Sequence, residues 1–340
     1  MSAHQIVYLV FGIVLSIALV MDLGLLSKKN KIISIKSALY QTFFWVSLAL
    51  AFFVFLLFEG PQLATENTTA DVAVGKYQLA FEFLSAYLME WSLSIDNIFV
   101  FILIFNSFNV QPKNYSRVLL IGILMAIVFR ILFITVGVAL VAKFHWVLYI
   151  FGVFLVYTGY KMFTSNEDEA FDPHESKIYK LLKKFMPLTA TDGDGKFMIR
   201  ENGKPVYTTL FVVVVLLAAI DLVFALDSIP AVMGISRDPL IIYTSNIFAV
   251  LGLRSLFFLL RGAVNKFDYL QQGIAIVLVF IGVKMLGEHW INMWVSKPVQ
   301  VGISLGVIAL CITGSIFYSL FMKKKNMPPD VVDDSVLPKQ

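Results

Sequence analysis

The stretch "LMEWSLSIDNIFVF" (residues 88–101) interrupts a long apolar run with three strongly polar side chains, Glu90, Asp96 and Asn97. The chain around it has 340 residues, of which 59% are hydrophobic and only 15% are charged, and its mean hydropathy is +0.81. These values lie outside the usual range of soluble domains. They predict an all-α polytopic membrane protein in which the polar side chains of 88–101 are buried.

Nine runs of mostly apolar residues are long enough to cross the hydrocarbon core of a bilayer, which is about 30 Å thick. They lie at 5–26, 37–58, 78–106, 117–142, 146–163, 206–233, 239–260, 268–286 and 299–322. Lysine and arginine gather in cytoplasmic loops, and their alternation between the runs predicts an N-terminus outside and a C-terminus in the cytoplasm. The first run lacks a basic n-region and a cleavage site, so we expect a retained helix there.

A second stretch, "AIDLVFALDSIPAV" (219–232), repeats the polar pattern of 88–101 at the same spacing and 131 residues later. Its polar members are Asp221, Asp227 and Ser228. Each stretch is followed by a helix with one embedded arginine and then by a third similar run, "FGVFLVYTGYKMF" or "IAIVLVFIGVKML", that ends near Lys161 or Lys284. Three helices are an odd number, so the second copy must enter the membrane from the opposite side. The pattern predicts a 3+3 inverted repeat of helices 3–5 and 6–8, which is typical of secondary transporters.

The repeat divides the chain into five segments. These are 1–76 with two helices and an outer loop, 77–163 as repeat 1, 164–205 as a cytoplasmic loop, 206–287 as repeat 2, and 288–340 as helix 9 and a cytoplasmic tail. Within the loop, "SKIYKLLKKF" predicts an amphipathic helix on an anionic membrane surface. The pair Asn202-Gly203 between two short extended runs predicts a β-hairpin.

The buried acids of the two copies are the candidate metal ligands. On a straight helix, Asp96 lies about 120° around and about 9 Å along from Glu90, so one ion is not easily held by both. We therefore expect Asp96 to face Asp227 of the other copy, with Glu90 and Asp221 beside them. Pro230 lacks a backbone N–H and favours local unwinding of the second copy. Neutral oxygen ligands are expected from Asn97, Ser228 and Asn246.

Two arginines, Arg130 and Arg254, lie in the helices that follow the acidic stretches. A charge at the bilayer centre costs about 2.5–3.5 kcal/mol on insertion scales, so each needs a partner. The arginines can pair with two of the carboxylates, as helix contacts or as gates, and the remaining acids are then left for a cation. Carboxylate, amide and hydroxyl oxygens suit Mg²⁺, Ca²⁺ and Mn²⁺, whereas Zn²⁺ and Cu⁺ favour imidazole and sulfur. The single cysteine, Cys311, excludes a thiolate metal cluster.

The motifs "EWSLSIDNIFVF", "FALDSIPAV" and "YTSNIFAVLGLRSL" resemble the TerC family of integral membrane proteins, and the resemblance covers nearly the whole chain. It implies a multi-pass exporter of metal ions in the bacterial inner membrane, with Mn²⁺ as the first candidate. The positions that match the acidic motifs of the family are Glu90, Asp96, Asn97, Asp221, Asp227, Ser228, Asn246 and Arg254. Tellurium resistance, which gives the family its name, is a phenotype and does not identify the cargo.

The predicted function is efflux of a divalent metal ion by alternating access, with proton coupling because buried acids take up protons when no cation is present. The expected partners are the ion and the lipid bilayer, with no nucleic acid and no required cofactor; Mn²⁺ enters as substrate. One alternative is a scaffold or metal-loading partner for other membrane proteins. Intramembrane aspartyl proteolysis is a weaker one, and we expect no enzyme. The sequence favours no particular oligomeric state.

Overall fold

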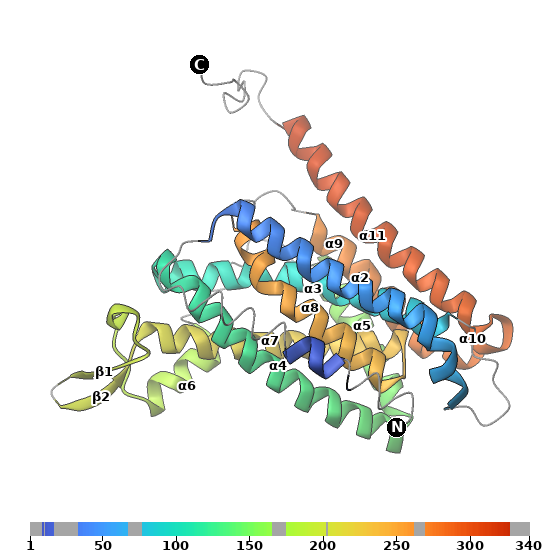
Figure 1. Ribbon diagram of the computed structural model, residues 1–340, viewed down its shortest axis with the longest axis horizontal. Coiled ribbons are helices and arrows are strands. Elements are labelled where there is room, and N and C mark those ends of the chain that lie inside the picture. The colour runs from blue at the N-terminus through green and yellow to red at the C-terminus, as the bar shows by residue number, and fades with distance from the viewer. Residues whose placement is uncertain are drawn as a thin grey trace.

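A computed structural model of the protein describes residues 9, 11–16, 33–66, 77–164, 175–201, 203–261 and 269–326. Long helices form one bundle, and a small hairpin and the short helix α10 lie at opposite ends of it (Figure 1). The long helices are α2 (Ile35–Glu66), α3 (Gln78–Ser107), α4 (Pro112–Lys143), α5 (Val147–Thr164), α7 (Thr209–Ile235), α8 (Pro239–Leu260), α9 (Leu270–Leu286) and α11 (Lys297–Asn326). The shorter elements are α6 (Lys177–Phe185), α10 (Glu288–Trp294), η1 (Gly193–Gly195), β1 (Met198–Glu201) and β2 (Lys204–Tyr207).

Seven of the described helices are long and apolar enough to span a membrane. An eighth span is formed if α9 and α10, which meet at a bend of 80°, are counted together. The all-α polytopic membrane architecture is thereby confirmed. The first predicted run, 5–26, lies mostly outside the described residues, so the count of nine stays a prediction.

The packing of the helices follows the predicted correspondence of α3, α4 and α5 with α7, α8 and α9. Helix α3 packs extensively on α8, and α4 packs on α7. Exchanging the two copies converts one of these pairs into the other. Two copies related by a two-fold axis would pack in this way, and the inverted repeat itself stays a prediction.

Helices α5 and α9 form the most extensive helix pair of the bundle. A Cβ atom added to Gly152 would lie 3.1 Å from the carbonyl oxygen of Gly282, and one added to Gly159 would lie 2.7 Å from that of Ala275. The two contacts run in opposite directions along the helices, so α5 and α9 are antiparallel. Small residues at such positions allow two backbones to approach closely.

The expected unwinding at Pro230 is not observed. Helix α7 is continuous from Thr209 to Ile235 with Pro230 inside it. A proline removes one helical hydrogen bond, and the flanking turns of a helix that is buried over much of its length can tolerate that loss. The carboxylates of α7 are therefore presented by a regular helix.

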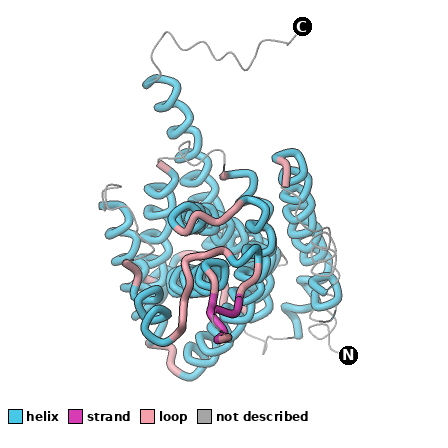
Figure 2. The backbone as a smooth tube through the Cα atoms, turned by 90° about the vertical axis from the view of Figure 1, so that its left-hand side faces the viewer, coloured by secondary structure: helices cyan, strands magenta, loops and turns pink. Residues whose placement is uncertain are grey.

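The segment 164–205 has, in its described part, the elements that its sequence predicts. Helix α6 is amphipathic and begins at Ser176, whose side chain accepts a hydrogen bond from the backbone N–H of Tyr179 at 3.2 Å. Strands β1 and β2 pair in antiparallel fashion, and Gly203 in the connection has a φ of +77°. Figure 2 shows this hairpin in front of the ends of the helices. Arg117 of α4 attaches the segment to the bundle, because its Nη1 donates to the carbonyl oxygen of Gly195 at 2.8 Å.

Candidate functional site

The side chain of Arg130 lies at the centre of the bundle and is 1% exposed. Its Nε donates to Asp221 Oδ2 at 2.8 Å, and its Nη2 donates to Asp221 Oδ1 at 3.0 Å. Its Nη1 forms an ion pair with Glu90 and also lies 3.2 Å from Asn246 Oδ1. The planar guanidinium suits this two-pronged binding of a carboxylate. We call these four residues the Arg130 cluster.

Four helices contribute one residue each to the Arg130 cluster. Glu90 comes from α3, Arg130 from α4, Asp221 from α7 and Asn246 from α8. Glu90 and Asp221 hold matching places in the two predicted copies, so one arginine joins both. The amide of Asn246 is fixed in orientation, because its Nδ2 donates to the carbonyl oxygen of Ile242 at 3.0 Å.

The Arg130 cluster contains two carboxylates and one guanidinium, all of them buried. With both acids ionised, it carries an excess negative charge. Among the described residues, the second carboxylate oxygen of Glu90, Oε2, has no hydrogen-bond partner. Burial of an uncompensated charge is costly. Oε2 of Glu90 is therefore an acceptor of the cluster that is open to a further donor or to a cation.

A cavity of about 250 Å³ lies between α3, α5, α7 and α9. It is lined by Leu93, Asn97, Thr158, Lys161, Met162, Phe224, Asp227, Gln271 and Leu278, and we call it the Asp227 cavity. Thr158 Oγ1 donates to Asp227 Oδ1 at 3.2 Å. Asn97 of the first acidic stretch and Asp227 of the second thus line the same space, where carboxylate, amide and hydroxyl oxygens are available to a cation.

The predicted site residues are distributed over two places. Glu90, Asp221 and Asn246 belong to the Arg130 cluster, and Asn97 and Asp227 belong to the Asp227 cavity. The six-residue spacing explains the division, because it turns the two acids of one helix about 120° apart. No group of three or more His, Cys, Asp or Glu side chains that could hold a metal forms within the described part of the chain. Glu90 and Asp221 both pair with Arg130, and the expectation that they flank a metal stays a prediction.

Three further predicted site residues are Ser228 on α7, Arg254 on α8 and Asp96 on α3. Ser228 follows Asp227 on α7 and is buried, and within the described structure its hydroxyl has no hydrogen-bond partner. Arg254 is buried on α8. Asp96 belongs to α3 next to Asn97, but its side chain lies outside the described residues. The expected pairing of Asp96 with Asp227 therefore stays a prediction.

Three polar residues of the Asp227 cavity were not among the predicted ligands. Lys161 had a signal, because it ends a repeated run, and Thr158 lies three residues before it on the same face of α5. Gln271 had none, since it stands at the start of an ordinary apolar helix. Only the packing of α9 on α5 brings it to the site.

Comparison with known proteins agrees with this architecture. The model of the Integral membrane protein TerC family matches residues 76–327. An uncharacterized membrane protein of Myxococcus xanthus is 40% identical over 93% of this chain and 92% of its own length. The protein named "Putative membrane-bound redox modulator Alx" in Escherichia coli K12 is 37% identical over 88% of this chain and 91% of its own length. No solved structure matches. The chain belongs to the TerC family of integral membrane proteins.

Proposed function

We propose that this protein exports a divalent metal ion, with Mn²⁺ as the substrate, from the cytoplasm across the bacterial inner membrane. The observation that carries the proposal is the meeting of Asn97 and Asp227 in one cavity. These residues come from the two acidic stretches, one in each predicted copy of the repeat. A site between two inverted copies is where secondary transporters bind their substrates.

The lining of the Asp227 cavity supports a hard divalent cation. Its oxygen groups are the Asp227 carboxylate, the amides of Asn97 and Gln271, and the hydroxyl of Thr158. Oxygen ligands suit Mn²⁺, Mg²⁺ and Ca²⁺. Lys161 lines the same cavity, and its positive charge would oppose the binding of a cation there.

The Arg130 cluster supplies a reason for coupling between the ion and protons. It joins α3 and α4 to α7 and α8, and hence one predicted copy to the other. A proton on Glu90 would remove the excess negative charge and weaken its attraction to Arg130. Protonation would thereby change how tightly the two copies are held together. The antiparallel α5 and α9, whose backbones touch at Gly152 and Gly282, form the interface about which the copies would rock.

The orientation belongs to the same proposal. The segment that holds α6 and the β-hairpin carries many lysines and lies at one end of the bundle. The positive-inside rule assigns this end to the cytoplasm. With the predicted N-terminus outside, α10 then lies at the outer end, and the C-terminus is cytoplasmic.

Uptake of Mn²⁺ by inverted membrane vesicles from cells that express the protein tests the proposal. We expect the wild type to accumulate Mn²⁺ and Asp227→Asn to lose at least about nine tenths of the rate, since a bound divalent ion depends on its carboxylate. Asp194→Asn is the matched control, because Asp194 is an exposed loop residue at φ +54°, a conformation that asparagine also adopts. Wild-type uptake by Asp227→Asn would refute the site.

A scaffold or metal-loading role for other membrane proteins is the alternative. Under that role, the exposed cytoplasmic segment would matter more than the buried carboxylate. Deletion of 166–186 would then abolish function while Asp227→Asn would spare it. The name of the Escherichia coli relative refers to redox modulation. This chain has one cysteine, Cys311, so an internal disulfide cannot support a redox activity here.

A further inference from the structure

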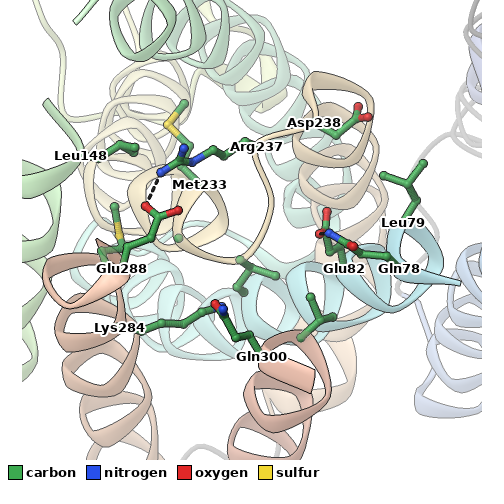
Figure 3. A pocket seen from close by; sticks show the side chains of 14 residues that line it. Gln78, Leu79, Glu82, Leu148, Met233, Arg237, Asp238, Lys284, Glu288 and Gln300 are labelled. Carbon is green, nitrogen blue, oxygen red and sulfur yellow. Dashed lines mark hydrogen bonds and ion pairs between the residues drawn. The ribbon is translucent and has the colours of Figure 1, made fainter. Parts of the chain in front are cut away.

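A cavity of about 350 Å³ lies at the end of the bundle near α10 (Figure 3). It is bounded by the starts of α3, α5, α10 and α11 and by the ends of α7 and α9. Its charged and amide side chains are Gln78, Glu82, Arg237, Asp238, Lys284, Glu288 and Gln300. We call it the Glu82 cavity. The residues assigned above to the Arg130 cluster and to the Asp227 cavity take no part in it.

Glu82 is the buried acid of this cavity and is 6% exposed. Its Oε1 accepts a hydrogen bond from Gln78 Nε2 at 2.6 Å, and its Oε2 accepts one from Ser236 Oγ. The carboxylate of Glu82 and the amide of Gln78 line the cavity, and both carry oxygens. This is the ligand chemistry that hard divalent cations prefer.

The charges around Glu82 favour a cation as well. Three carboxylates line the cavity against two cationic side chains, so an excess of negative charge remains. One of the pairs, Arg237 with Glu288, lies at the more exposed side, where Figure 3 shows it apart from Glu82. Lys284 lines the same cavity as Glu82 and donates a hydrogen bond to Ser304 Oγ at 3.0 Å. A metal ion in the cavity would therefore have to bind against the repulsion of this ammonium group.

The two cavities occupy corresponding places. Lys161 and Met162 line the Asp227 cavity, and Lys284 and Met285 line the Glu82 cavity. These pairs hold the same positions in "FGVFLVYTGYKMF" and "IAIVLVFIGVKML". Because α5 and α9 are antiparallel, the two lysines mark opposite ends of one helix pair. The two cavities thus lie on opposite sides of the α5–α9 contact.

The acids of the two cavities do not correspond. The residue that matches Glu82 at the offset of 131 is Val213. The Glu82 cavity thus has the position of a second access chamber, but its ligand set is its own. Two chambers with different ligands are expected to bind the same ion with different affinities.

We propose that the Glu82 cavity is a second, weaker site for the transported divalent cation, on the side opposite to the Asp227 cavity. Its role as an exit site rests on the proposed transport function. Glu82 would bind the ion together with the amide oxygen of Gln78, which lines the same cavity. The positive charge of Lys284 in this cavity would oppose binding and favour release of the ion from the protein.

Equilibrium dialysis of the purified full chain against radioactive Mn²⁺ tests the site without any transport. We expect the wild type to show one tight and one weak site, and Glu82→Gln to lose only the weak one. Lys284→Met removes the competing ammonium and should raise the affinity of the weak site by about tenfold, as loss of a nearby like charge implies. Glu175→Gln is the matched control, because Glu175 is an exposed acid that pairs with Lys180 outside both cavities, and it should keep both sites.

Weak binding that is the same in Glu82→Gln as in the wild type overturns the proposal, and so does Lys284→Met with unchanged affinity. If Glu82→Gln does not fold, the Mn²⁺ affinity of the weak site in Lys284→Met tests the proposal alone. Mn²⁺ flux in proteoliposomes separates the two proposals. A lower maximal rate in Glu82→Gln with an unchanged half-saturating concentration supports the exit role. Loss of the weak site in a protein whose wild type shows no flux supports the cation site and refutes transport.

Discussion

Arg130 binds Asp221 through two parallel hydrogen bonds of 2.8 and 3.0 Å, and the two residues belong to different predicted copies of the repeat. The same guanidinium pairs with Glu90, which holds the place of Asp221 in the first copy. A buried group that binds one carboxylate from each of two halves of a protein fixes the distance between those halves. The relationship makes Arg130 a structural centre that joins the two predicted copies.

Replacement of the buried Arg130 should lower the free energy of unfolding far more than replacement of an exposed arginine. Arg130→Met leaves two buried carboxylates without a counter-charge, and we expect a loss of about 3–5 kcal/mol of unfolding free energy. Arg237→Met breaks the more exposed pair with Glu288 and should cost less than about 1 kcal/mol. Unfolding of both variants in detergent, followed by circular dichroism, measures the difference. Equal losses would contradict the central role of Arg130.

The close contact of α5 and α9 predicts an unusual effect of alanine. In most helices Gly→Ala is stabilising by up to about 1 kcal/mol. A Cβ at Gly282, however, would lie 2.7 Å from the carbonyl oxygen of Gly152, so Gly282→Ala must separate the helices and should be destabilising by about 1–3 kcal/mol.

Gly302 on α11 provides the control for this prediction, because a Cβ there meets no described atom within 4 Å. Gly302→Ala should leave the midpoint of thermal unfolding unchanged or raise it. If Gly282→Ala also raises the midpoint, the helices are not in backbone contact at that position.

Thr158 should affect the ion through Asp227. Its hydroxyl donates to Asp227 Oδ1 at 3.2 Å, and a net hydrogen bond of about 1 kcal/mol corresponds to a change of roughly fivefold in an equilibrium constant. Thr158→Val should therefore shift the Mn²⁺ concentration that protects the protein against thermal unfolding by about that factor. Thr135→Val, at an exposed position of α4, should cause no shift. A Thr158→Val protein with wild-type protection would remove this hydroxyl from the site.

The sequence predicted the elements of the fold better than it predicted the site. Apolar runs, the Asn202-Gly203 turn and the amphipathic pattern of α6 are local features, and the helices and hairpin appear where these features lie. Which helices touch is a property of the whole chain. The sequence therefore predicted Glu90 and Asp221 as site residues, but it left open whether Arg130 or a metal ion would neutralise their charges.

Two further details show that local sequence features do not determine which side chains of different helices meet. The turn of an α-helix places Glu90 and Asp96 on different faces, and this local geometry explains why the polar residues divide into two groups. It does not tell which side chains of other helices complete each group, and so Thr158 and Gln271 remained unpredicted. Pro230 was expected to unwind α7, yet the helix is continuous, because local preference yields to packing in a bundle.

The segment that holds α6 and the β-hairpin should detach from the bundle when one side chain is changed. Arg117 donates to the carbonyl oxygen of Gly195 at 2.8 Å and lies 4.7 Å above the ring of Phe197. Arg117→Met should leave the membrane helices intact while hydrogen exchange of β1 and β2 increases by about tenfold, for a loss of about 1–2 kcal/mol. Lys113→Gln, an exposed change on the same helix, should leave exchange unaltered. Unchanged protection in Arg117→Met would show that other contacts attach the hairpin.

The meeting of Asn97 and Asp227 in one cavity is best tested by moving the carboxylate across it. Mn²⁺ flux is measured in proteoliposomes that contain the wild type, Asp227→Asn, or the double variant Asn97→Asp with Asp227→Asn. We predict that the single variant loses flux and that the double variant recovers a measurable part of it, because a carboxylate again lines the same cavity. Full flux in Asp227→Asn, or a double variant as inactive as the single one, would contradict a cation site shared by α3 and α7.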